Sequence, residues 1–425
     1  MPPRPLSPPA ASSWRGRRRT VLALVLAAVI LISAARIYRA HRAAAGGARE
    51  SAAVMAETAR GPASKAASAS AATPPEARPE SAARAGVDAS NFYKDAFVLY
   101  AKLSDEEKKM FRQSLTEVDA DKAAALFKKI QPILELLRQG AAADYCEWGL
   151  GPLDFAKPLP HLSKSHQLGK LAQWSAAYRF PKDPQGALGD LTAQARLGDH
   201  LADSVIGWLV QMSFEGGSNK VLSQNAGLLD EAGMAQAEAL LHSSSVEKNV
   251  LRAFAAEAGA VELTAKKLAA EDPSERMKLF LESESNEEAN HTTLQRLFQD
   301  EAALTAEFHY LAQIEQQMAA AIPSPDAQYQ AWWEGVKTAL PQHPLAALLL
   351  PGFMEMRTRL QQSQVERAML SAGLTLLQNT SAQPAQFRDP VSGAAFAYME
   401  KADGFELQST FKKNGKPVTM SFTRR

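Results

Sequence analysis

The pattern of apolar and polar positions divides the chain into an apolar run near the N-terminus, a stretch poor in large apolar side chains, and a long region of helical periodicity. The apolar run covers residues 20–38, and its first part, 20–35, carries no charged residue. An apolar helix of about 20 residues spans a hydrocarbon core of roughly 30 Å. We therefore expect a transmembrane signal anchor at 20–38, embedded in the lipid bilayer and preceded by a basic cytoplasmic segment at 1–19.

Two other interpretations of the apolar run stay open. The run is short and small residues follow it, so it also fits a cleaved signal peptide, cut after Ala35 or Ala45. The pair Arg18-Arg19 loosely fits a twin-arginine export signal. Five arginines precede residue 20, and this charge bias predicts that the N-terminus stays inside. We expect a single-pass protein of the bacterial inner (plasma) membrane with its C-terminal domain outside the cytoplasm, or secretion after cleavage.

Residues 39–90 have the composition of an Ala/Pro-rich disordered linker. Nineteen of the fifty residues in 41–90 are alanine, and no aromatic residue lies between Tyr38 and Phe92. Such a stretch lacks the large apolar side chains that offset the entropy lost on ordering.

The charge differs between the two parts of the chain. Residues 1–90 contain 13 Lys and Arg and 5 Asp and Glu, whereas residues 91–425 contain 34 Lys and Arg and 41 Asp and Glu. The basic N-terminal part, 1–90, suits binding to anionic lipid headgroups. Alternatively, its arginines only stop transfer across the membrane and keep the linker soluble. The acidic remainder of the chain does not favour binding to nucleic acid.

Residues 91–385 are expected to form an α-helical ectodomain. Ser104 and Glu107 have the spacing of a capping box, which predicts that a helix starts there. In the next helix, Pro132 predicts a kink and Gly140 predicts the end. Apolar positions at helical spacing predict helices over 122–138, 163–179, 187–214, 230–242, 246–270, 287–321 and 353–378, with a loop over 149–160.

The last segment, 386–425, alternates apolar and polar positions in three short runs and predicts a β-meander. Asp403-Gly404 and Asn414-Gly415 separate the runs, and such pairs supply the positive φ of a hairpin turn. The apolar positions of one face must pack on the helices, because an isolated hairpin is marginal in water. These positions are Phe396, Phe405, Leu407 and Phe411. The predicted fold class is mainly α, with an N-terminal transmembrane helix, a disordered linker, a multi-helix ectodomain and a small C-terminal antiparallel β-meander.

Two short stretches carry a family resemblance. Residues 389–410, DPVSGAAFAYMEKADGFELQST, and Cys146-Glu147-Trp148 ahead of a Leu-Pro-His-Leu turn at 159–162 resemble motifs of an uncharacterised family of single-pass, membrane-anchored bacterial envelope proteins. The first stretch is also similar to the tail of some type II secretion pseudopilins, although the chain lacks their Gly-Phe-Thr-Leu-x-Glu site. The resemblance implies an N-terminal span, a helical ectodomain and an envelope location, and it implies no activity.

Candidate catalytic patterns are weak. Glu288 and His291 have the Glu-x-x-His spacing of di-iron bundles, and Glu301 continues that helix face, but a second copy of the motif is missing. The sequence has neither a Gly-x-Ser-x-Gly elbow nor a P-loop lysine. Cys146 is the one cysteine, so an intramolecular disulfide is excluded. We expect a buried, inert thiol there, with pairing between chains as the alternative.

Two polar patches contain histidine. His161 and His166 flank a predicted helix start, and Asp199-His200 with Asp203 forms the second patch. Neither patch offers the third ligand, at a defined spacing, that a zinc site needs. Solvated or interhelical polar contacts are the simpler interpretation. We therefore expect no catalytic residue, no metal site and no cofactor.

Tryptophans supply the candidate ligand or partner surface, at Trp148, Trp174, Trp332 and Trp333. Adjacent helical residues point about 100° apart, so one member of the Trp332-Trp333 pair should pack and the other should sit at a rim. The function that we expect is a non-enzymatic structural or interaction module that contacts an envelope protein partner. A helical module that binds a ligand or peptide is the alternative, followed by an envelope hydrolase.

Overall fold

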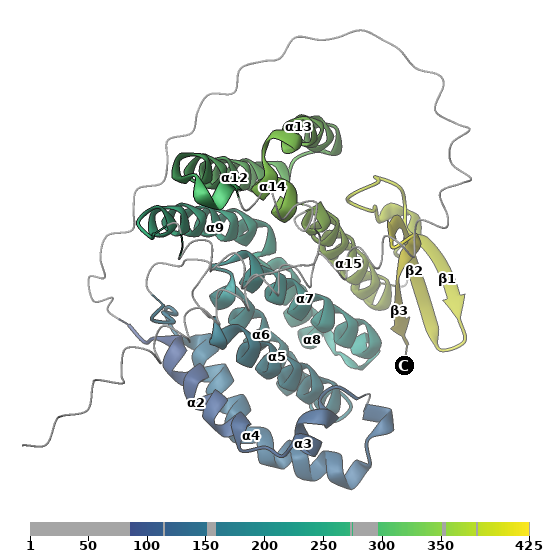
Figure 1. The fold of residues 1–425 in the computed structure, drawn as a ribbon. Coiled ribbons are helices and arrows are strands. Elements are labelled where there is room, and N and C mark those ends of the chain that lie inside the picture. The colour runs from purple at the N-terminus through teal and green to yellow at the C-terminus, as the bar shows by residue number, and fades with distance from the viewer. Residues whose placement is uncertain are drawn as a thin grey trace, which may run out of the picture.

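The computed structural model describes residues 86–113, 115–150, 159–272, 274, 296–350, 354–379 and 381–424. These residues are mainly helical and end in a three-stranded antiparallel sheet (Figure 1), so this part of the predicted fold class is confirmed. The expected segments 1–19 and 20–38 lie outside the described residues, as does the expected linker up to residue 85. In the part that is described, no helix is both long and apolar enough to cross a bilayer.

The helices pack side by side in an order that largely follows the chain (Figure 1). They are α2 (Ala89–Ala101), α3 (Asp105–Met110), α4 (Ala120–Ala142), α5 (Pro160–Arg179), α6 (Pro184–Leu201), α7 (Val205–Asn225), α8 (Glu231–His242), α9 (Val246–Ala269), α12 (Glu301–Ala321), α13 (Asp326–Ala339), α14 (Pro344–Leu349) and α15 (Met354–Gln378). Helix α2 packs on α4, α4 and α5 pack on α6, and α7 lies between α6 and α9. Helix α12 packs on α9. Helix α15 packs on α7 and α8, and the sheet packs on α15.

Short polar side chains start most of these helices. Ser104 accepts a hydrogen bond from the backbone N–H of Glu107, whose side chain accepts one from Ser104 N, so the predicted capping box is confirmed. Asp88 starts α2 by accepting a hydrogen bond from Ser90 N. Helix α2 therefore begins at Ala89, ahead of the boundary expected at residue 91.

The sequence predicted that the helix containing Pro132 ends at Gly140, and this prediction is wrong. Gly140 lies inside α4, which continues to Ala142, and Pro132 also lies within the same helix. A Cβ atom at Gly140 would lie 2.5 Å from Cε1 of Tyr93 on α2. Glycine is therefore needed here for the close approach of two helices, not for a helix end.

Two predicted long helices are each divided by an N-cap. The segment 187–214 forms parts of α6 and α7, because Ser204 accepts a hydrogen bond from Gly207 N and starts a new helix. The segment 287–321 does not continue through Asp300, which accepts a hydrogen bond from Ala303 N and starts α12. Periodicity alone missed these breaks, since the apolar positions continue on both sides of each cap. It also missed α13 and α14.

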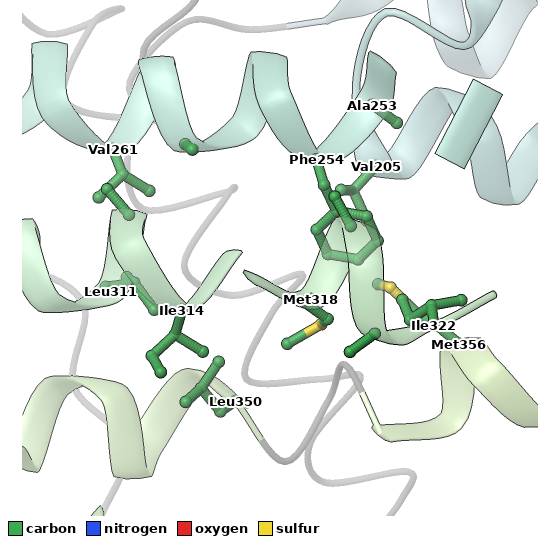
Figure 2. Close-up of a cluster of buried hydrophobic side chains, with 14 of the residues drawn as sticks. Val205, Ala253, Phe254, Val261, Leu311, Ile314, Met318, Ile322, Leu350 and Met356 are labelled. Atoms are coloured by element: carbon green, nitrogen blue, oxygen red, sulfur yellow. The ribbon is translucent and has the colours of Figure 1, made fainter. Parts of the chain in front are cut away.

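The largest apolar cluster fills the seam between α9 and α12 and extends to α14 and α15 (Figure 2). Phe254 and Val261 of α9 meet Leu311 and Met318 of α12, and each of these residues is at most 2% exposed, with the first three fully buried. A second cluster joins α2, α4, α5 and α6, and a third joins α5, α6, α15 and the sheet. Burial of these faces is the main driving force for the arrangement.

The predicted β-meander is confirmed. Strands β1 (Ala397–Lys401), β2 (Gly404–Lys413) and β3 (Lys416–Thr423) pair antiparallel in chain order. The apolar face packs on α15 and α7, with Phe405 and Leu407 at most 1% exposed. Asn414 and Gly415 both have positive φ, at 51° and 76°, so the predicted hairpin turn between β2 and β3 is present.

The predicted role of Gly404 is wrong, because Gly404 does not have positive φ and belongs to β2, opposite Thr423. A Cβ atom at Gly404 would lie 1.8 Å from the carbonyl oxygen of Phe422. The side chain of Phe422 approaches a second glycine: a Cβ atom at Gly373 of α15 would lie 2.0 Å from Cζ of its ring. Both glycines serve the close packing of β3, between its neighbouring strand and the helix beneath it.

Candidate functional site

An open groove of about 750 Å³ lies between the C-terminal end of α8, the turn that joins α12 to α13, helix α15, and the turn at 390–391. One face of α15 contributes residues spaced four, three, four and three apart, which places them on one stripe of the helix. These residues are Arg357, Gln361, Gln364, Ala368 and Ser371. The stripe is polar or small, in contrast to the apolar stripe of α15 that contacts the protein core.

Arg357 fixes one wall of the groove. Its side chain is 8% exposed and donates hydrogen bonds to the carbonyl oxygens of Ile322 at 2.6 Å and Ser324 at 2.8 Å, and to Asp326 Oδ1 at 2.5 Å. The guanidinium also lies 4.3 Å from the ring centroid of Tyr329. Carbonyl groups at the end of α12, which have no partner within the helix, are thereby satisfied. Because its donors are engaged, Arg357 shapes the groove and does not offer a free cation to a ligand.

Arg367 of α15 also lines the groove. Its Nε atom lies 3.2 Å from Glu215 Oε1, and a second ion pair joins it to Glu247. Glu215 also accepts hydrogen bonds from Ser363 at 2.5 Å and from Ser244 at 3.0 Å. Two carboxylates therefore pair with one guanidinium where α7, α9 and α15 meet.

A small pocket of about 40 Å³ lies beside Glu215. Polar groups that include Asp199, Gln211 and Asn219 line it together with apolar side chains. Asn219 is 2% exposed, and its Nδ2 atom has no hydrogen-bond partner among the described residues. A space of this size holds a few water molecules, which would satisfy that donor.

The residues of the Asp199-His200-Asp203 patch point to different partners. Asp199 accepts hydrogen bonds from Ser245 and from Gln211 Nε2, the latter at 2.7 Å, and burial raises its pKa above the usual range despite these contacts. Asp203 pairs with Arg252 at 3.1 Å. His200 Nδ1 lies 2.9 Å from the hydroxyl oxygen of Tyr93. These three side chains therefore make contacts between helices and the connections that join them.

Trp148 belongs to a stack of rings between α2 and α5. Its ring centroid lies 4.7 Å from that of His161 and 5.7 Å from that of Tyr93, and its Nε1 donates to His200 O at 2.9 Å. Burial lowers the pKa of both His161 and His200 to about 4. Burial likewise raises the pKa of the nearby Cys146 thiol to about 12. At neutral pH these groups are uncharged, which suits packing and gives no reactive thiolate.

The other tryptophans of the predicted surface lie elsewhere. Trp174 is 4% exposed and packs edge-on against Phe111 in the same cluster as Trp148. Trp333 is 5% exposed in the α9–α12 cluster, whereas Trp332 stays partly exposed and donates from Nε1 to Gln317 Oε1 at 3.2 Å. The structure thus does not gather the four residues into one surface, and none of them lines the groove.

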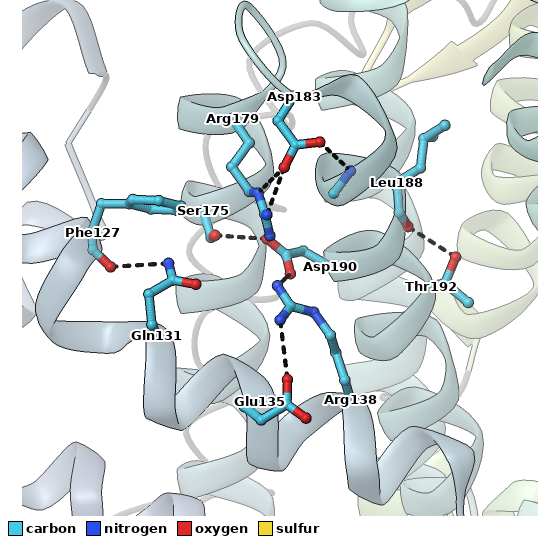
Figure 3. Close-up of polar contacts among 11 residues, drawn as sticks. Phe127, Gln131, Glu135, Arg138, Ser175, Arg179, Asp183, Leu188, Asp190 and Thr192 are labelled. Carbon is cyan, nitrogen blue, oxygen red and sulfur yellow. Dashed lines mark hydrogen bonds and ion pairs between the residues drawn. The ribbon is translucent and has the colours of Figure 1, made fainter.

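A charge network around a buried aspartate joins α4, α5 and α6 (Figure 3). Asp190 is fully buried; its carboxylate accepts hydrogen bonds from Arg138 Nη2 at 2.5 Å and from Ser175 Oγ at 2.7 Å. Arg179 approaches the same carboxylate at 3.5 Å and pairs with Asp183, the N-cap of α6. Paired and hydrogen-bonded in this way, the charges fix three helices relative to one another.

Across the described residues, no group of three or more His, Cys, Asp or Glu side chains is placed to hold a metal ion. The Glu288 and His291 pattern lies outside these residues. Glu307 Oε1 lies 2.8 Å from His343 Nδ1. This pair holds the start of α14 against α12, because Glu307 also accepts a hydrogen bond from Leu345 N. Comparison with models of known families, with characterised proteins and with solved structures found no match. The family resemblance therefore stays a prediction.

Proposed function

We propose that this protein is a membrane-anchored, non-enzymatic interaction module of the bacterial envelope, and that the groove along α15 holds an extended segment of a partner protein. The observation that carries the proposal is the polar stripe of α15 at the floor of a 750 Å³ groove. A volume of this size suits a ligand or a few peptide residues. The apolar run at 20–38 and its flanking arginines support the anchor.

The chemistry of the lining favours a peptide over a reacting substrate. Gln364 and Ser371 offer an amide and a hydroxyl group, which match the N–H and C=O groups of an extended backbone, whereas Gln361 Nε2 already donates to Asp326 Oδ1 at 2.9 Å. Catalysis by general acid and base needs titratable groups free to exchange protons with the substrate. In the groove Asp326 is engaged by Arg357, and Arg367 is engaged by two carboxylates. Asp326, Arg357 and Arg367 are therefore structural, and His242 is the remaining ionisable side chain that lines the groove.

Site-specific photo-cross-linking in living cells tests the proposal. A photoreactive amino acid at Gln364 should give a discrete cross-linked product with a protein partner, whereas the same group at Thr358, exposed on another face of α15, should not. The substitution Ser371→Trp fills the groove and should remove the product while the helical circular dichroism stays unchanged. Equal products at both positions, or a product unaffected by Ser371→Trp, would show that the groove is not the binding site.

A further inference from the structure

Two glutamates occupy core positions in the seam between α9 and α12. Glu257 lies three residues after Phe254 and four before Val261, and Glu315 lies four residues after Leu311 and three before Met318. Each acid therefore sits in the stripe that faces the other helix. Figure 2 shows the apolar side chains that surround this seam.

The pair lacks compensating positive charge. Glu315 is 1% exposed, and its Oε2 atom has no hydrogen-bond partner among the described residues. Glu257 is partly exposed as a residue, which leaves solvent protons a way to the pair, and a backbone N–H at Val205 on α7 hydrogen-bonds to it. Phe254 lies beside Met318 and Val261 lies beside Leu311 (Figure 2), so Glu257 and Glu315, which sit between these pairs on their own helices, lie opposite each other across the seam.

The other charged groups on the neighbouring elements are already committed. On the α14 side of α12, Glu307 pairs with His343. On α9, Arg252 pairs with Asp203 in the connection that precedes α7. The first residue of α13, Asp326, pairs with Arg357 of α15. Within the part of the chain that the structure describes, no lysine, arginine or histidine forms an ion pair with Glu257 or Glu315.

We propose that the carboxyl groups of Glu257 and Glu315 form a proton-dependent latch: they pack in the α9–α12 seam when protonated, and they loosen it when both ionise. Two carboxylates in one site repel each other, and ionised groups are costly to hold in an apolar surrounding. Because α12 also supports α13 and α14, loosening the seam exposes the apolar cluster beneath them. The latch thus makes the packing of α9 on α12 respond to the pH around the domain.

The pKa directions agree with this geometry and set the sign of the effect. Burial raises the pKa of Glu257 to about 7, against the opposing hydrogen bond from Val205. Burial, with the charge of Glu257 as a second cause, raises the pKa of Glu315 well above its usual value. The folded state therefore binds more protons than the unfolded chain above about pH 4.5, so this pair makes folding less favourable as pH rises.

Thermal unfolding of the full chain in detergent, measured from pH 5 to pH 9, tests the latch. The Tm of the wild type should fall by about 5 °C over this range, since ionisation of the pair destabilises the folded state as pH rises. Glu315→Gln should remove at least half of that fall. Glu262→Gln, a change of a partly exposed acid on α9, should leave it intact.

Two further measurements keep the test decisive. If Glu315→Gln does not fold, Glu315→Leu serves the same purpose, because an apolar side chain suits the seam at every pH. Hydrogen exchange of the wild type, corrected for intrinsic rates, should show loss of protection in α9 and α12 at pH 9 but not in α4. The proposal is overturned if the variant that folds keeps the wild-type slope, or if protection falls equally in all three helices.

Discussion

Ser409 of β2 donates a hydrogen bond to the buried carboxylate of Asp389, a residue twenty positions earlier in the chain. Asp389 is 1% exposed and also accepts hydrogen bonds from Val391 N at 2.8 Å and Ser392 N at 3.1 Å. Gly393 follows with φ of 70°. The two ends of the DPVSG…GFELQS pattern are therefore one structural unit, which ties the turn after α15 to the middle strand of the sheet.

We expect Ser409→Ala to destabilise the domain by about 1–3 kcal/mol, because a buried carboxylate loses a donor. Burial alone would raise the pKa of Asp389, but the hydrogen bonds from Ser409 and the backbone hold it below its usual value. The stability that these bonds contribute is present above about pH 4 and is lost as pH falls through the folded-state pKa. Chemical denaturation at pH 7 and at pH 3 measures both effects. Thr419→Ala, an exposed change on β3, should cost little, and an equal loss in both variants would contradict the prediction.

Phe405→Ala should lower the Tm of the whole helical domain in one cooperative transition. Phe405 is fully buried and stacks 5.0 Å from Phe422, and truncation of a core aromatic costs about 3–5 kcal/mol. The exposed change Lys412→Ala should have almost no effect. Circular dichroism at 222 nm as a function of temperature follows both variants. An unchanged helical melting curve after deletion of 389–425 would mean that the sheet is an appendage.

Gly140→Ala should destabilise by about 1–3 kcal/mol, because the new Cβ would lie 2.5 Å from Cε1 of the buried Tyr93. Gly259→Ala is the matched control, since it also lies within a long helix and a Cβ atom there meets nothing within 4 Å. Alanine favours helix over glycine by about 1 kcal/mol, so the control should stabilise. Urea titration of the two variants gives opposite shifts in midpoint if the α2–α4 contact is as close as described.

His161 and His200 should make the domain sensitive to acid. Burial lowers the pKa of both to about 4, so the folded state binds fewer protons than the unfolded chain, and their contribution to stability is lost as pH falls from about 6.5 towards 4. His161→Gln should reduce this loss by about 1–2 kcal/mol, allowing for solvent screening of a partly exposed ring. His309→Gln, at an exposed position of α12, is the control. Identical acid unfolding midpoints for the wild type and His161→Gln would refute the assignment.

The proposed membrane topology predicts that alkaline phosphatase fused after Arg425 is active, because the single apolar run precedes the domain and arginines cluster ahead of it. A reporter that works only in the cytoplasm should be inactive at the same position. The reverse result would place the domain inside. Deletion of 1–38 should abolish membrane association without altering the melting curve of the domain.

Local chemistry explains which features of the fold were predictable. The Ser104–Glu107 capping box and the Asn414-Gly415 turn are decided by residues next to one another, and both are present. Gly140 and Gly404 were misread because a glycine that relieves a close tertiary contact looks the same in sequence as one that ends a helix or forms a turn. Only the partner atoms, on Tyr93 and Phe422, distinguish the two roles.

The sequence by itself determined the helical periodicity, several helix starts, the alternation of the C-terminal strands and the apolar run at 20–38, since each depends on neighbouring residues and on chain-local geometry. Only the tertiary structure decided that a polar stripe of α15 lines a groove, and that Glu257 and Glu315 meet within an apolar seam. From the sequence alone, a polar residue on a helix is expected to face solvent, and only the position of the neighbouring helix shows that it is buried. Residues far apart in the chain come together through packing, and the free energy of packing depends on the whole set of faces that are buried at once.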